Sequence, residues 1–161
     1  MTPEKLLVRI RRMILFFIVA LVLSGLTAFP IYSELKWASE HSLMAQQGIF
    51  GPWLQKVWEG VQAIHDQYGF LFYGYDWLAF AHLVIAMAFI GPYRNPVQNR
   101  WVIEWGMMAC AAIIPLALIA GPVRGIPWYH IVVDCSFGII GIIPLWLTRK
   151  WIKKLVLISR H

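Results

Sequence analysis

The chain of 161 residues is 60% hydrophobic, only 14% charged, and has a formal net charge of +6 at neutral pH. A water-soluble domain of this size needs far more polar surface, so the composition excludes that class of protein. The positive charge does not indicate nucleic-acid binding, because the basic residues lie at the ends of apolar runs and not on a polar face.

Four apolar runs are long enough to cross a bilayer as helices, since a spanning helix needs about 20 residues. In chain order they cover approximately residues 13–31, 70–90, 101–120 and 127–147. Too little sequence remains for a second domain. The pattern therefore predicts an all-α integral membrane protein, a four-helix bundle that forms a single membrane domain.

The first run follows the basic residues Lys5, Arg9, Arg11 and Arg12. A secretory signal peptide has the same basic start and apolar centre, but its cleavage site carries small residues in an Ala-x-Ala-like pattern. The candidate site at residues 26–28 begins with Leu. We therefore expect a retained membrane helix.

Proline and glycine mark the expected ends of the later helices. Gly91-Pro92 is expected to end the second helix, and Asn95-Pro96 to cap and begin the third. Pro115 predicts a kink in the third helix, which neighbouring helices in a membrane can accommodate. Pro127 is expected to begin the fourth helix, and Pro144 to loosen its last turn.

Positive charge predicts the orientation. The N-terminal arm, the loop from Arg94 to Arg100 and the tail after Leu147 together hold eleven of the fourteen Lys and Arg residues. Short cytoplasmic segments carry this excess in membrane proteins. The sequence therefore predicts a multi-pass protein of a bacterial-type inner (plasma) membrane, with both termini cytoplasmic.

Two further segments are expected to lie along the membrane surface. In the outer segment, residues 32–68, apolar and polar residues alternate at helical spacing after Gly51-Pro52, which predicts an amphipathic helix in the outer interface. This helix either caps the bundle or shapes an entrance for a lipid-soluble ligand. The basic tail, residues 148–161, is expected to bind anionic lipid headgroups, with a protein docking site as the alternative.

Placing an ionisable side chain inside a membrane span costs free energy, so each such residue in the sequence calls for a structural or functional explanation. Counted from the cytoplasmic ends at 1.5 Å per residue, Asp76 and Asp134 both lie about 21 to 22 Å up. His130 is one turn above Asp134 on the same helix face. Arg124 lies at the outer end of the third expected helix and Tyr75 near the start of the second. The long side chains of both residues can therefore reach this level. The sequence thus predicts a ligand- or proton-binding cluster.

Three interpretations of that cluster remain open. Two carboxylates and an imidazole can bind a divalent metal or pass protons, which makes Asp76, His130 and Asp134 metal-ligand candidates. With Arg124 the same groups can form an ion pair that joins helices. Alternatively, Asp76 caps a helix that begins at Trp77.

His82 is expected near the midplane, about 13 Å up. Haem b in membrane cytochromes is held by two histidines at one depth, and His130 lies roughly 13 Å higher by the same count. At the level of His82 the count places Cys110 and Gly138, which offer no second iron ligand. A haem with a single protein ligand, or a quinone bonded to His82, remains an alternative to a histidine bonded to a backbone carbonyl.

The sequence contains no nucleotide-binding loop, zinc-protease motif or nucleophile elbow. We therefore expect a non-enzymatic membrane component, an accessory or structural subunit whose partners are the lipid bilayer and other membrane protein subunits. The alternative is an electron-transfer subunit, a membrane oxidoreductase component that binds haem or quinone near His82 and handles protons at the outer-leaflet cluster.

Overall fold

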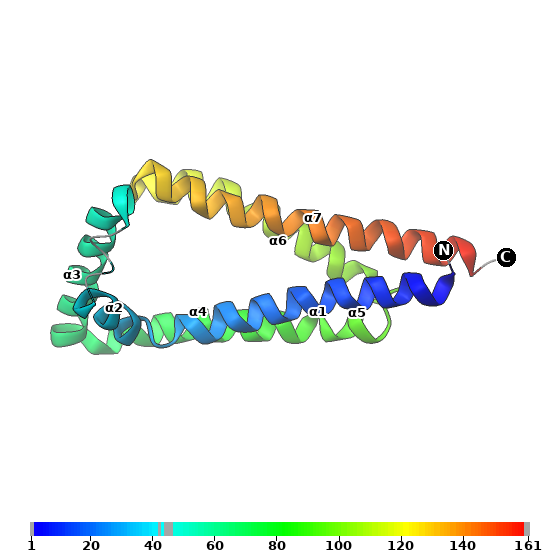
Figure 1. Ribbon diagram of the computed structural model, residues 1–161, viewed down its shortest axis with the longest axis horizontal. Helices are drawn as coiled ribbons and strands as arrows, with labels where there is room; N and C mark the ends of the chain where they lie inside the picture. The colour runs from blue at the N-terminus through cyan, green and yellow to red at the C-terminus, as the bar shows by residue number, and fades with distance from the viewer. Residues whose placement is uncertain (1, 42, 44–46, 160–161) are drawn as a thin grey trace. The chain divides into compact units, whose positions relative to one another are not determined.

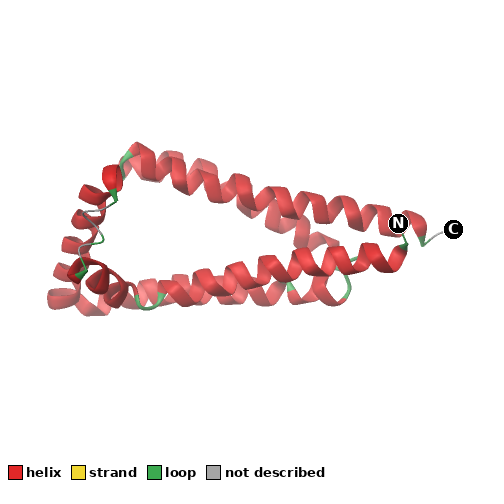
Figure 2. Ribbon diagram, in the orientation of Figure 1, coloured by secondary structure: helices red, strands yellow, loops and turns green. Residues whose placement is uncertain are grey.

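The computed structural model describes residues 2–41, 43 and 47–159, and its regular structure over these residues is entirely helical (Figures 1 and 2). This confirms the predicted all-α class. The helices, in chain order, are α1 (Pro3–Ala28), α2 (Ile31–Glu40), η1 (Gly48–Phe50), α3 (Gly51–Tyr68), η2 (Gly69–Leu71), α4 (Phe72–Ala88), α5 (Ile90–Arg94), α6 (Arg100–Val123) and α7 (Trp128–Ile158).

Length and hydropathy make the chain a multi-pass helical membrane protein. Three helical stretches among the described residues can each cross a bilayer: Gly48–Arg94, with a mean hydropathy of 1.4, and α6 and α7, each with 2.0. A fourth span is added if α1 and α2, which are bent by 73° at their junction, count as one. The four predicted spans correspond to this higher number.

Helix α1 begins ten residues before the predicted span, so the basic arm is itself helical. Its buried residues Leu6, Ile10 and Ile14 are four apart and therefore share one face. This stripe explains why a sequence with four cations folds as a helix here. The charged residues occupy the remaining faces.

The predicted boundaries around Gly91-Pro92 and Asn95-Pro96 are wrong. Helix α4 ends at Ala88, and Gly91 and Pro92 lie in the first turn of α5, where the missing proline N–H costs no hydrogen bond. Asn95 forms a turn instead of capping α6, because its Oδ1 accepts a hydrogen bond from the Gln98 N–H at 3.1 Å. The N-cap of α6 is Asn99.

The chain folds as two compact units, one made of residues 1–20 with 86–161 and the other of residues 21–85. In the first unit α6 and α7 lie side by side along their lengths (Figure 1). They approach closely at glycines: a Cβ at Gly138 would lie 2.5 Å from the Cys110 carbonyl oxygen, and one at Gly121 would lie 2.6 Å from Ile131 Cδ1. Small residues at these points let the two helices pack closely.

The core of the first unit surrounds Phe89, which is fully buried. Its ring lies 4.8 Å from that of Phe17, and a Cβ at Gly106 would lie 2.8 Å from Phe89 Cζ. Arg11 on α1 donates hydrogen bonds to the carbonyls of Tyr93 and Arg94, at 3.2 and 3.4 Å. These carbonyl groups belong to the last residues of α5 and have no hydrogen-bond partner within that helix. The two hydrogen bonds from Arg11 therefore link α1 to the end of α5.

Helix α7 continues eleven residues beyond the predicted end of the fourth span, through most of the basic tail. Pro144 lies inside it. The Thr148 hydroxyl, although fully buried, is satisfied because it donates to the Pro144 carbonyl at 2.7 Å. The helix therefore passes Pro144 without ending.

The second unit holds the predicted amphipathic helix, which is confirmed as α3 and begins at Gly51-Pro52. Trp58 on its buried face packs against Tyr32 of α2, with ring centroids 5.6 Å apart. The backbone leaves helical geometry at Tyr68 (φ −139°, ψ 43°), and α4 follows in a new direction (Figure 1). The last turns of α1 pack on α4, where a Cβ at Gly25 would lie 2.9 Å from the Ala79 carbonyl oxygen.

Candidate functional site

Asp76 lies in the second turn of α4, because that helix begins at Phe72. The interpretation of Asp76 as the cap of a helix starting at Trp77 is therefore wrong. Inside a helix the backbone N–H groups are already bonded, so the Asp76 carboxylate needs partners from elsewhere. Its side chain is half-buried.

Aromatic side chains surround Asp76. The carboxylate lines a shallow hollow of about 260 Å³ with Phe29, Tyr73, Trp77 and Phe80. The last three form a ladder along α4, with edge-to-face contacts at centroid distances of 6.0 Å. A carboxylate among aromatic faces suits a cationic or hydrogen-bond-donating group. A ligand-binding role for Asp76 stays a prediction.

His130 and Asp134 lie one turn apart on α7, as the sequence indicates. His130 Nε2 is 3.9 Å from Asp134 Oδ1, and the two side chains are 38% and 41% exposed. The pair is too long for a hydrogen bond but within the range of an ion pair when the imidazole is protonated. Two ionisable groups thus stay half-exposed in a candidate membrane span.

The remaining members of the predicted cluster lie on different elements. Arg124 is an exposed residue that follows α6, and no ion pair joins it to Asp134 among the described residues. Tyr75 is exposed on α4, with its ring 6.5 Å from Phe72. Asp76 belongs to the second unit and Asp134 to the first, so their convergence stays a prediction.

His82 is bonded within its own helix. Its Nδ1 lies 2.8 Å from the carbonyl oxygen of Leu78. A carbonyl only accepts, so Nδ1 carries the hydrogen and the neutral ring keeps a lone pair on Nε2. A Cβ at Gly25 of α1 would lie 3.2 Å from His82 Cβ, so that glycine gives the histidine its space.

No group of three His, Cys, Asp or Glu side chains in the described part of the chain is arranged to hold a metal ion. The metal interpretation of Asp76, His130 and Asp134 therefore has no geometric support. The pair on α7 and the single carboxylate on α4 remain candidates for binding a ligand or a proton.

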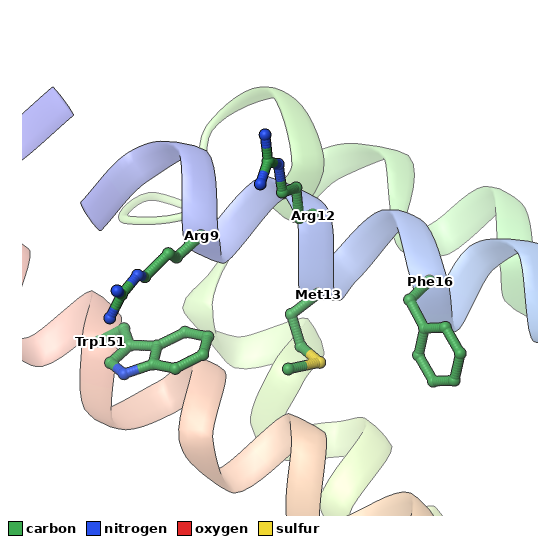
Figure 3. Close-up of a pocket in the computed structure, with 5 residues that line it drawn as sticks. All are labelled: Arg9, Arg12, Met13, Phe16 and Trp151. Atoms are coloured by element: carbon green, nitrogen blue, oxygen red, sulfur yellow. The ribbon is translucent and has the colours of Figure 1, made fainter. Parts of the chain in front are cut away.

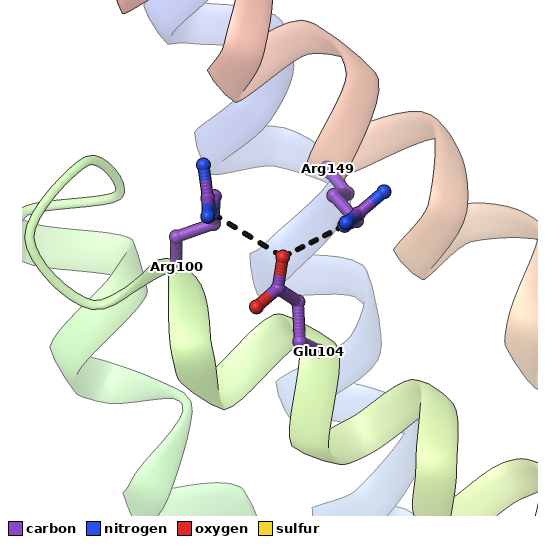
Figure 4. Close-up of polar contacts among 3 residues, drawn as sticks. All are labelled: Arg100, Glu104 and Arg149. Atoms are coloured by element: carbon purple, nitrogen blue, oxygen red, sulfur yellow. Dashed lines mark hydrogen bonds and ion pairs between the residues drawn. The ribbon is translucent and has the colours of Figure 1, made fainter.

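Sequence reasoning missed a polar cluster that joins α6 to α7 (Figure 4). Arg100 and Glu104, four residues apart on α6, form an ion pair with Nε 3.3 Å from Oε1. Arg149 of α7 donates to the same oxygen at 2.8 Å. The first pair follows from spacing within one helix. The second joins residues 45 apart in the chain, and no local pattern indicates it.

In comparisons with protein-family models, curated proteins and solved structures, no significant match to the chain was found.

Proposed function

We propose that the protein is a non-enzymatic accessory or structural subunit of a larger assembly in a bacterial-type inner membrane, with both termini cytoplasmic. The observation that carries the proposal is the half-exposed pair of His130 and Asp134 on α7. Ionisable groups at membrane depth are costly when they face lipid. A second protein that covers this face of α7 would remove that cost.

Two further features support a partner on this face. Phe137 is 63% exposed and lies one turn beyond Asp134, so a large ring continues the polar pair along one side of the helix. Gly138, one turn beyond Asp134 on the same side of α7, packs closely against α6. Phe137 therefore lies beside the face of α7 that packs on α6, and together with His130 and Asp134 it offers both apolar and charged groups to a partner at that edge.

Site-specific photocrosslinking tests the proposal. A benzophenone side chain at Phe137, irradiated in native membranes, is expected to give a discrete adduct heavier than the protein by the mass of a partner. The matched control is Ile139, which is 55% exposed and points to the opposite side of α7, because two residues turn a helix by about 200°. At Ile139 the expected products are lipid adducts.

Mass spectrometry of the Phe137 adduct identifies the partner, and Asp134→Leu is expected to reduce its yield. Lipid adducts alone at both positions, together with a sharp monomer band in native electrophoresis under several mild detergents, contradict the proposed subunit role. A self-adduct would indicate that the assembly is a homo-oligomer.

The bonding of His82 favours a second candidate, an electron-transfer subunit that binds haem or quinone. In metal-binding histidines one ring nitrogen commonly donates to a backbone carbonyl, which orients the ring and leaves the other nitrogen for the ligand. The bond from His82 Nδ1 to Leu78 has this form. Because Gly25 has no side chain, α1 lies close against α4 at His82, where a Cβ would lie 3.2 Å from the His82 Cβ.

An absorption spectrum of the purified protein, oxidised and reduced, tests this second candidate. It predicts a Soret band, or extractable quinone, that is lost in His82→Ala and retained in His130→Ala. A colourless protein without extractable quinone contradicts it. The control at His130 separates loss of a ligand from general loss of a membrane histidine.

A further inference from the structure

One side of α1 carries an ordered series of polar, cationic and apolar groups beside α7. A hollow of about 430 Å³ is lined by Glu4, Lys5, Val8, Arg9 and Arg12. A second hollow, of about 410 Å³, shares the two arginines with the first and is otherwise lined by Met13, Phe16 and Trp151. The arginines thus line both hollows, one among charged side chains and one beside apolar side chains.

The arginines of this basic end divide into two groups. Arg149 and Arg100 pair with Glu104, and Arg11 bonds to backbone carbonyls. By contrast, no ion pair or hydrogen bond to another described residue involves Arg9 or Arg12, and both are exposed. Their charge is available to an anion from outside the protein.

The apolar half of the groove is built from two helices. Figure 3 shows Arg9 extending from α1 toward Trp151 of α7, with Met13 and Phe16 projecting on the same side, while Arg12 leaves the opposite side of the ribbon. Phe16 is 63% exposed, although it lies in the apolar run. Trp151 is half-buried, and tryptophan favours the membrane interface.

The spacing along α1 matches the thickness of a lipid headgroup region. From Arg9 to Phe16 the helix rises about 10 Å, and the apolar run begins at Met13. A phosphate at Arg9 therefore lies at the membrane surface while a chain attached to it lies along Met13 and Phe16. Lys5 and Glu4 then contact the part of the headgroup that extends beyond the phosphate. Because Glu4 is the one carboxylate beside Lys5, Arg9 and Arg12, the site keeps a net positive charge.

We propose that the groove formed by Arg9, Arg12, Met13, Phe16 and Trp151 is a binding site for one anionic phospholipid. Arg9, which extends toward Trp151, holds the phosphate, since guanidinium donates to phosphate oxygens in a planar fork. Arg12, on the other side of the ribbon, adds positive charge near the headgroup. Phe16, Met13 and Trp151 contact the acyl chain. This site is independent of the subunit role proposed above, because it requires only that the basic end lie at a bilayer surface.

Native mass spectrometry of the full-length protein tests the site, with phosphatidylglycerol and phosphatidylcholine titrated in turn into neutral detergent. The expected result is one tightly bound phosphatidylglycerol, with phosphatidylcholine retained less well. In Arg9→Gln/Arg12→Gln the affinity for phosphatidylglycerol is expected to fall about twentyfold, as two cations near an anionic surface contribute. Inorganic phosphate in excess is expected not to displace the lipid, since it lacks the acyl chain.

The matched control removes two other cations from the same end of the protein. Lys153 and Lys154 are exposed on α7 and do not line the groove, so Lys153→Gln/Lys154→Gln is expected to change the affinity less than threefold. Equal loss in both double variants would show a general charge effect and overturn the site. Equal retention of phosphatidylcholine, or displacement of the lipid by phosphate, would also overturn it. Phe16→Ala, which keeps both arginines, is expected to weaken binding as well.

Discussion

An alkaline phosphatase reporter fused after Lys56 is expected to be active, whereas the same reporter fused after Asn99 is expected to be inactive. A third fusion, after Gly125 between α6 and α7, is expected to be active again. The enzyme requires disulfides that form only outside the cytoplasm, so its activity reports the side of the membrane. The expected effect is close to all-or-none.

The reason for this alternation is the distribution of positive charge. Four cations precede the apolar part of α1, whereas only Lys36 and Lys56 follow it before the next span. Translocating the N-terminal arm would carry the larger number of cations across the membrane, against the usual bias. The long α7 ends in a further basic segment, which stays on the same side as the arm.

The opposite pattern has two distinguishable causes. If α1 and α2 lie on one side of the membrane and only three stretches span it, the three reporters invert while an N-terminal tag remains cytoplasmic. If the whole protein is inverted, the tag becomes accessible to protease from outside. Inversion by either route contradicts the proposed topology, and the tag identifies which part of it is wrong.

The sequence was most informative where hydrophobic length and periodicity decide the structure. The apolar runs became helices because a bilayer requires internally bonded backbone, and α3 begins at Gly51-Pro52 as its spacing indicates. The extension of α1 to Pro3 was missed because the predicted span was limited to the apolar run, which begins at Met13. The stripe of Leu6, Ile10 and Ile14 was already present in the sequence and could have revealed it.

Contacts between distant residues could not be predicted. Arg149 reaches Glu104, and Arg11 reaches the end of α5, because helix packing brings these groups together and nothing local encodes it. Asp76 was identified from the sequence because a carboxylate inside a membrane span costs free energy. Its aromatic surroundings depend partly on Phe29, in the turn that follows α1, so the hollow emerged only from the fold.

Replacing Gly138 with alanine is expected to destabilise the contact between α6 and α7 by about 1–3 kcal/mol, the usual range for an overpacked interface. The added Cβ would lie 2.5 Å from the carbonyl oxygen of Cys110. That oxygen belongs to the backbone of α6, so it cannot move without shifting the helix. The measurement is the free energy of unfolding in mixed micelles during titration with a denaturing detergent.

Gly141 provides a comparison that separates backbone from side-chain crowding. A Cβ there would lie 2.8 Å from the Cys110 Sγ, which is part of a side chain. Gly141→Ala is therefore expected to cost less than Gly138→Ala, and Cys110→Ala should relieve it. The same Cys110→Ala background should not relieve Gly138→Ala, because the carbonyl remains.

At Gly74, where a Cβ meets no described atom within 4 Å, alanine is expected to be neutral or slightly stabilising, since it favours helix more than glycine does. Equal unfolding free energies for Gly138→Ala and Gly74→Ala would mean that α6 and α7 do not meet at Gly138, whereas rescue of Gly138→Ala by Cys110→Ala would assign the close contact to the sulfur.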